Sequence, residues 1–191
     1  MLVTKQEPRR LKMLLSRKPN IALLGFMGTG KTQTGKILAR MLKMEFVDVD
    51  QELEKMARMD IPSLVHKKGE IKFMELEILA IKKCCRKKNS VISCGGGAIL
   101  NFLNTIRLRK NARLFLLTAH PKELVRRLRN EKTRPLAHLP DKEKEIRIAE
   151  ILEARKSFYD ATGAVRIKTD GKTPKEVAEM IVRLLHENSE S

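Results

Sequence analysis

The sequence predicts an α/β fold, in which a parallel sheet is flanked by helices on both faces. From Ile21 onward, short apolar runs alternate with amphipathic stretches, and this alternation is typical of parallel strands joined by helices. A glycine-rich turn, Gly25-Phe-Met-Gly-Thr-Gly-Lys31-Thr32, separates the first apolar run from the amphipathic stretch that follows. With 191 residues, 42% of them hydrophobic, the chain is long enough for one domain with its own core.

The first half of the chain is expected to hold three strands. The apolar run at 21–25 predicts the first strand, and the period of the amphipathic stretch at 31–42 predicts the helix after it. The same reasoning predicts two more strands at 45–49 and 90–93, and two more helices at 51–57 and about 71–85.

The second half continues the alternation around one irregular stretch. We expect strands at 113–117 and 165–168, and helices at 121–129, at about 143–159 and after Pro174. Residues 130–144 carry two prolines and several charges without an apolar period. A loop of this length in a compact domain is usually functional or disordered, so we predict a lid at about 130–144.

The ends of the chain divide it into two parts. Pro8 and Pro19 bracket a basic stretch with little apolar periodicity. We therefore interpret residues 1–19 as a basic N-terminal extension and residues 20–191 as a single domain.

The chain is strongly basic, with 40 Lys and Arg against 23 Asp and Glu and a formal net charge of +17. Such a charge can bind nucleic acid by releasing counterions from its phosphates. The sequence has one tyrosine, no tryptophan and no recognition motif, so we expect a solvated surface that steers small anions rather than a nucleic-acid partner.

Three cysteines without paired spacing, and no long apolar segment or secretory signal, point to a cytoplasmic protein without a membrane partner.

The glycine-rich turn fits the phosphate-loop pattern G-x-x-x-x-G-K-[ST], in the strand–turn–helix context that this motif requires. Its glycines let the backbone N–H groups approach phosphates. Lys31 would add a positive charge at the β- and γ-phosphates, and the hydroxyl of Thr32 would bind Mg²⁺. The alternative is a glycine-rich turn that binds no nucleotide.

Two carboxylates, Asp48 and Asp50, lie at the end of the expected second strand. Alternation along a strand would put both on one face at the carboxyl edge of the sheet, where ligands of open α/β sheets bind. One could hold Mg²⁺ and the other could accept a proton from a substrate hydroxyl. The alternative is that Asp50 only caps the helix expected from Gln51.

Two further segments offer contacts to a ligand. Three consecutive glycines, Gly95, Gly96 and Gly97, follow the strand at 90–93 and leave the backbone open to a ligand; the alternative is a tight turn. Arg134, in the predicted lid, could close over nucleotide phosphates, or it could be an exposed loop arginine.

Together these motifs resemble the shikimate kinase family, whose members use ATP to phosphorylate the 3-hydroxyl of shikimate. The resemblance runs from about Asn20 to the C-terminus and covers the phosphate loop, Phe46-Val-Asp-Val-Asp50, the glycine run, Arg134-Pro-Leu and Arg155-Lys-Ser-Phe-Tyr159. It implies a five-stranded parallel sheet in the order 2-3-1-4-5, a cytoplasmic location and aromatic amino acid biosynthesis as the pathway. We further expect a monomer.

The resemblance also implies a role for each matching residue. A substrate-binding region would span about 48–80, with Asp50 contacting the shikimate hydroxyls and acting as the catalytic base. ATP would be bound by Gly28, Thr29, Gly30, Lys31, Thr32, Gln33 and Arg134, Mg²⁺ by Thr32 and Asp48, and shikimate by Asp50, Gly95, Gly96, Gly97 and Arg155, with Lys31, Asp50 and Arg134 as the catalytic residues.

The chain departs from the family pattern at Met74. The family motif G-E-x-x-F-R-x-x-E appears here as 69–77, with Met74 in place of the arginine that would bind the substrate carboxylate. Methionine supplies neither charge nor hydrogen-bond donor, so Arg155 would hold the carboxylate alone and Glu77 would have no arginine partner and would repel an anionic substrate. Arg58 stands where relatives often have a helix-ending glycine.

Three functions are consistent with this departure: a shikimate kinase with a weakened carboxylate site, a kinase for another small polyol, and a nucleotide-binding protein without turnover.

Overall fold

A computed structural model describes residues 20–129, 136 and 138–187. The predicted N-terminal extension at 1–19 and the predicted lid residue Arg134 lie outside the described residues.

The centre of the fold is a five-stranded sheet in the order β2-β3-β1-β4-β5, and every pair of neighbouring strands is parallel. This confirms the predicted fold class and strand order. All five residues of β1, the central strand, are buried, which explains the apolar run that follows Asn20. The strands are β1 (Asn20–Leu24), β2 (Glu45–Asp48), β3 (Ser90–Ser93), β4 (Ala112–Thr118) and β5 (Val165–Lys168).

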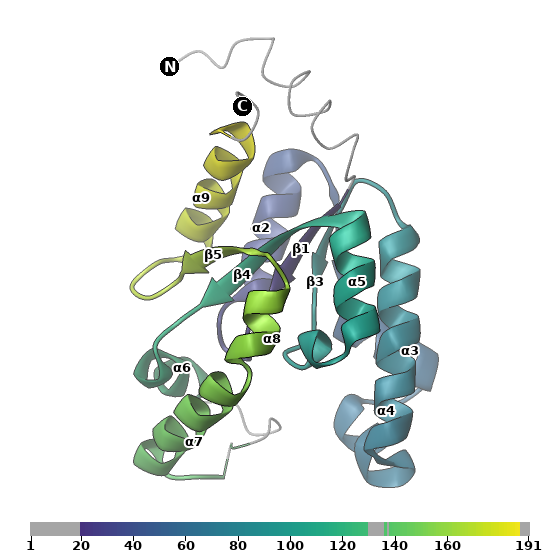
Figure 1. Cartoon of the computed structure of the whole chain (residues 1–191), viewed down its shortest axis with the longest axis vertical. Helices are drawn as coiled ribbons and strands as arrows, with labels where there is room; N and C mark the ends of the chain where they lie inside the picture. The colour runs from purple at the N-terminus through teal and green to yellow at the C-terminus, as the bar shows by residue number, and fades with distance from the viewer. Residues whose placement is uncertain (1–19, 130–135, 137, 188–191) are drawn as a thin grey trace.

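Helices cover both faces of the sheet, as Figure 1 shows. Helices α2 (Lys31–Leu42) and α9 (Pro174–Glu187) pack on one face, against alternate residues of β1 such as Ile21 and Leu23. The other face, which includes Ala22 and Leu24, is covered by α3 (Val49–Ala57), α4 (Ile61–Arg86), α5 (Phe102–Asn111) and α8 (Lys156–Ala161).

A third, smaller cluster lies next to the glycine-rich turn. Phe26 packs there with α6 (Pro121–Leu128) and α7 (Asp141–Ala154). A short 3₁₀ helix, η1 (Ala98–Leu100), follows the glycine run. No helix in the described part of the chain is both long enough and apolar enough to span a membrane.

The helix α5 has no counterpart among the predicted elements. Its apolar residues Phe102, Leu103 and Ile106 are exposed, whereas Asn104 and Thr105 are buried together with Leu108. The hydrophobic period therefore does not mark the buried face, and a prediction from that period misses the helix.

Helix α4 begins ten residues before the predicted start at residue 71. The side chain of Asp60 accepts a hydrogen bond from the backbone N of Ser63 at 2.8 Å, which caps the helix. Gly69 interrupts the helix with non-helical backbone angles, so the apolar period before it is out of step with the period after it.

The segment predicted as one helix at 143–159 forms two, because α7 ends at Ala154 and α8 begins at Lys156. Helix α7 begins at Asp141, so residues 141–144 of the predicted lid are helical. Of residues 130–140, which precede α7, only 136 and 138–140 are described.

All three cysteines are buried and unpaired: Cys84 and Cys85 near the end of α4, and Cys94 directly after β3. Burial raises the pKa of Cys84 to about 12 and that of Cys85 to about 11, because a thiolate loses its hydration there. The pKa of Cys94 is raised as well, for the same reason.

Candidate active site

The phosphate loop lies between β1 and α2, at the carboxyl edge of the sheet. Its first glycine, Gly25, packs directly against β4: a Cβ at this position would lie 2.3 Å from the carbonyl oxygen of Leu117, and its φ is +140°. Only glycine fits here. Gly30 precedes α2 without any side-chain cap, so the first N–H groups of that helix remain available for an anion.

Lys31 is held inside the loop. Its Nζ donates hydrogen bonds to the carbonyl oxygens of Gly25 and Phe26 at 2.8 and 2.9 Å, and the residue is only 9% exposed. The loop therefore keeps an ammonium group at its centre, close to the open N-terminus of α2. Thr29 is buried too, with its hydroxyl donating to the carbonyl oxygen of Phe26 at 2.8 Å.

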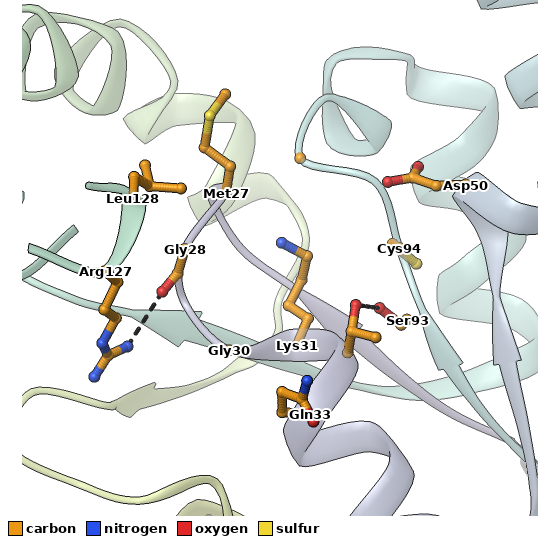
Figure 2. A pocket seen from close by; sticks show the side chains of 12 residues that line it. Met27, Gly28, Gly30, Lys31, Gln33, Asp50, Ser93, Cys94, Arg127 and Leu128 are labelled. Atoms are coloured by element: carbon orange, nitrogen blue, oxygen red, sulfur yellow. Dashed lines mark hydrogen bonds between the residues drawn. The ribbon is translucent and has the colours of Figure 1, made fainter. Parts of the chain in front are cut away.

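A cavity of about 330 Å³ opens in front of the loop. In Figure 2, Asp50 faces this cavity from the side opposite Gly28. Seven of the predicted site residues line the cavity: Gly28, Gly30, Lys31, Thr32, Gln33, Asp50 and Gly96. Met27, Ser93, Cys94, Arg127 and Leu128 complete its lining.

Three oxygen-bearing side chains meet at the edge of the cavity. The hydroxyl of Thr32 donates a hydrogen bond to Oδ2 of Asp48 at 3.1 Å and lies 3.4 Å from the hydroxyl of Ser93. Ser93 was not among the predicted site residues; its signal in the sequence is a polar side chain at the carboxyl end of a buried strand.

The sequence predicted that Asp48 and Asp50 share one face of a strand, and this prediction is wrong. Strand β2 ends at Asp48, and Asp50 lies in the first turn of α3. Asp48 is the residue that caps this helix, because its Oδ1 accepts a hydrogen bond from the backbone N of Asp50 at 3.1 Å. Capping thus falls to Asp48, and the Asp50 side chain is directed to the cavity instead.

A second carboxylate, Glu77, lies close to Asp50 at the glycine run. A Cβ on Gly95 would lie 2.6 Å from Oδ1 of Asp50 and 3.3 Å from Oε1 of Glu77, so both carboxylates approach the same backbone position. Glu77 is 5% exposed, and Oε2 accepts a hydrogen bond from Nδ2 of Asn104 at 3.3 Å. Burial first, and then the charge of Asp50, raise the pKa of Glu77 to about 7.

Arg155 reaches the glycine run from the end of α7. Its Nη1 donates a hydrogen bond to the carbonyl oxygen of Gly96 at 3.0 Å, and its guanidinium carbon lies 5.7 Å from the centre of the Phe26 ring. Gly97 precedes η1. Arg155 is therefore fixed beside the glycines that the sequence placed in the substrate site.

Arg127 lines the cavity but was not among the predicted site residues. Its guanidinium donates to the carbonyl oxygen of Gly28 at 3.3 Å (Figure 2). It also donates to the hydroxyl and carbonyl oxygens of Thr169 at 2.9 and 2.6 Å. Glu123, one turn earlier on α6, accepts a hydrogen bond from Nε at 2.7 Å. Arg127 thus ties the phosphate loop to the segment after β5.

Met74 stands at the position where the resemblance to the family implies an arginine. Met74 is 47% exposed. Lys72 forms an ion pair with Glu75 at 2.9 Å, so its ammonium does not replace the missing arginine. Arg58 ends α3 with φ +55° and is exposed, a left-handed conformation that explains why glycine would suit this position.

Glu77 gives a prediction about stability and pH. The folded protein binds the Glu77 proton more tightly than the unfolded chain, since the pKa rises from 4.5 to about 7 on folding. The free energy of unfolding should therefore fall by about 3 kcal/mol as pH rises from 4.5 through 7. We expect Glu77→Gln to lose this dependence, measured by urea unfolding at both ends of that range. The exposed Glu75→Gln is the control; an unchanged pH profile in Glu77→Gln would contradict the prediction.

Comparison with protein families gives a match to the shikimate kinase model over residues 27–186. Two curated relatives named shikimate kinase are similar over most of the chain. The protein of Caldanaerobacter subterraneus is 45% identical over 164 residues, which covers 86% of this chain and 94% of that protein. The protein of Thermodesulfovibrio yellowstonii is 42% identical over 164 residues, covering 86% and 93%.

Solved structures are similar as well. A shikimate kinase from Acinetobacter baumannii in complex with shikimate has a TM-score of 0.84 at 30% identity, covering 93% of this chain and 98% of that one. A gluconokinase from Sinorhizobium meliloti has a TM-score of 0.60 at 15% identity, covering 91% and 95%, and this likeness shows a shared fold alone.

Proposed function

The chain belongs to the shikimate kinase family, and we propose that it transfers the γ-phosphoryl group of ATP to the 3-hydroxyl of shikimate, giving shikimate 3-phosphate and ADP. One observation carries the assignment of residues: the phosphate loop and the carboxylate of Asp50 line the same cavity. A donor nucleotide and an acceptor hydroxyl can therefore meet in one place.

We propose that the phosphate loop binds ATP through backbone N–H groups of residues 28–33 and the ammonium of Lys31. In the structure that ammonium is bonded to two loop carbonyls, and it would exchange them for phosphate oxygens when ATP binds. A positive charge held in place before the reaction stabilises the transferring phosphoryl group without a cost of reorganisation.

The oxygens around Thr32 fit Mg²⁺. Hydroxyl and carboxylate oxygens are the ligands that this ion prefers, and it commonly binds few protein groups beside substrate phosphates. We propose that Thr32 and Asp48, which already share a hydrogen bond, hold the ion. When bound, Mg²⁺ would neutralise charge on the β- and γ-phosphates. The described residues contain no group of three or more His, Cys, Asp or Glu that could hold a metal ion.

Asp50 is the proposed base. It would accept the proton of the 3-hydroxyl as the oxygen forms its bond to phosphorus, in line with the bond that breaks to ADP. Glu77, with its pKa near 7, would keep a proton for much of the time, so that Asp50 carries the negative charge of the pair.

Substrate recognition is assigned to the glycine run and Arg155. Arg155 uses one guanidinium N–H on Gly96, and its other N–H groups would hold the shikimate carboxylate. The proposed role of Arg134 in closing over ATP remains a prediction, because this residue lies outside the described ones. The cytoplasmic location and the monomeric state likewise remain predictions.

The test is ADP release with MgATP and a shikimate titration, for the wild type and for Met74→Arg. We expect saturable, shikimate-dependent turnover, and a KM for shikimate about tenfold to a hundredfold lower in the variant, since a second guanidinium can pair with the carboxylate.

Met41→Arg is a matched control for this test, because Met41 is 44% exposed on α2 and the substitution adds the same charge. No shikimate-dependent ADP release from any of the three proteins would contradict the proposed function. An equal fall in KM for both variants would assign the effect to net charge.

A further inference from the structure

A second concave surface lies away from the candidate active site. This basic cleft has a volume of about 260 Å³. Five of its lining residues are cationic, and only two are uncharged. The lining consists of Lys82, Arg86, Lys87, Lys88 and Arg107, with Cys85 and Asn111.

The basic cleft lies at the edge of the sheet opposite the phosphate loop. Lys87 and Lys88 come shortly before the first residue of β3, Ser90, and Asn111 directly before the first residue of β4, Ala112. Because the strands are parallel, both positions are at the amino edge, whereas the phosphate loop follows the carboxyl end of β1. Steering of anionic substrates into the active site therefore does not explain these charges.

Little of the charge is neutralised within the described part of the chain. Lys87 forms an ion pair with Glu45, and Arg107 donates to the carbonyl oxygen of Ile78 at 3.2 Å. No ion pair there joins Lys82, Arg86 or Lys88 to a carboxylate.

Helix dipoles account for part of the cluster. Helices α4 and α5 both end at this edge, and a cation in the last turn of a helix is stabilised by the carbonyl groups there. Arg86 fits this explanation, since it is in the last turn of α4. Lys87 and Lys88 follow the end of α4, and Lys82 precedes its last turn. The cleft therefore holds more cations than the helix dipoles explain. The remaining cations are available to bind an anionic ligand.

We propose that the basic cleft binds the phosphate backbone of nucleic acid, without reading its sequence. An extended polyanion is favoured over a small one, because the net charge of the chain is +17 and its first 19 residues alone contain six Lys or Arg and one Glu. The lining of the cleft contains no aromatic side chain, so phosphate contact, rather than base stacking, is the mode of binding. This goes beyond the proposed kinase activity and differs from the expectation drawn from the sequence alone.

The proposal is tested by fluorescence anisotropy. A labelled DNA duplex of about 20 base pairs is titrated with the full chain at several salt concentrations. The cleft variant combines Lys82→Gln, Arg86→Gln and Lys88→Gln. The control variant combines Lys122→Gln, Arg147→Gln and Lys175→Gln, which removes the same charge from exposed positions on α6, α7 and α9.

We expect the cleft variant to bind at least about tenfold more weakly near 0.15 M salt, and the control variant within about threefold of the wild type. The dependence of log K on log salt should become shallower by up to about 3 in the cleft variant alone. Shikimate-dependent ADP release should be the same in all three proteins, so that failure of this proposal and failure of the kinase assignment are separable.

Three results would overturn the proposal: no duplex binding by the wild type at this salt concentration, an equal loss in both variants, or binding of inorganic tripolyphosphate in the cleft without binding of the duplex.

Discussion

Replacing Lys31 with alanine is expected to lower kcat by at least about 10³-fold. The substitution removes the ammonium that the loop holds with two carbonyl bonds, and with it the charge opposite the transferring phosphoryl group. The measurement is ADP release at saturating ATP and shikimate, with thermal unfolding followed by circular dichroism to establish that the variant is folded.

Lys36→Ala is the matched control for Lys31→Ala. Lys36 is on the same helix, is exposed, and lies over the ring of Phe46 at 5.9 Å, away from the cavity lining. Its loss should change turnover less than about threefold. Turnover of Lys31→Ala within tenfold of the wild type would refute the assignment of the loop to phosphoryl transfer.

The second large effect is expected for Asp50→Asn, with a fall in kcat of about 10²- to 10⁴-fold. Asparagine keeps the size of the side chain and can accept a hydrogen bond, but it does not take up the proton. ATP binding should stay within about threefold of the wild type, because the phosphates are bound by the loop and not by α3. Steady-state turnover and an ATP binding titration separate the two quantities.

Asp160→Asn is the control for Asp50→Asn, since Asp160 is an exposed aspartate on α8 that pairs with Arg166. If Asp50→Asn weakened ATP binding as much as turnover, Asp50 would be a binding residue and not the base.

The strands and the phosphate loop could be predicted because their signals are local. Helix α2 has the predicted bounds 31–42, and the strands at 90–93 and 165–168 have theirs. Strand β1 contains a run of four apolar residues at 21–24, and a phosphate loop needs glycine and lysine at fixed spacing. Neither signal depends on what packs against it.

The parts that could not be predicted depend on tertiary contacts. Helix α5 buries Asn104 because Glu77 is its partner on α4, and no period within 102–111 shows this. The contact of Arg127 with Thr169 joins residues 42 positions apart. Glu77 was expected to repel an anionic substrate, but its raised pKa follows from burial among residues of three elements, which sequence spacing does not reveal.

The assignment of Asp48 and Asp50 shows a different limit. The sequence placed both at the correct edge of the sheet, and both lie there. The exact end of β2 decided which residue caps α3, and element ends are where local signals are weakest.

The burial of the three cysteines has a practical consequence for work with this protein. A thiol reacts with alkylating reagents as its thiolate, and all three thiols have raised pKa values and exposures of 6% or less. A cysteine of the native chain is therefore labelled only when the structure around its thiol opens locally. Cys94 lines the candidate active site and Cys84 and Cys85 lie in α4, so their separate labelling rates would give site-resolved opening rates without any introduced probe.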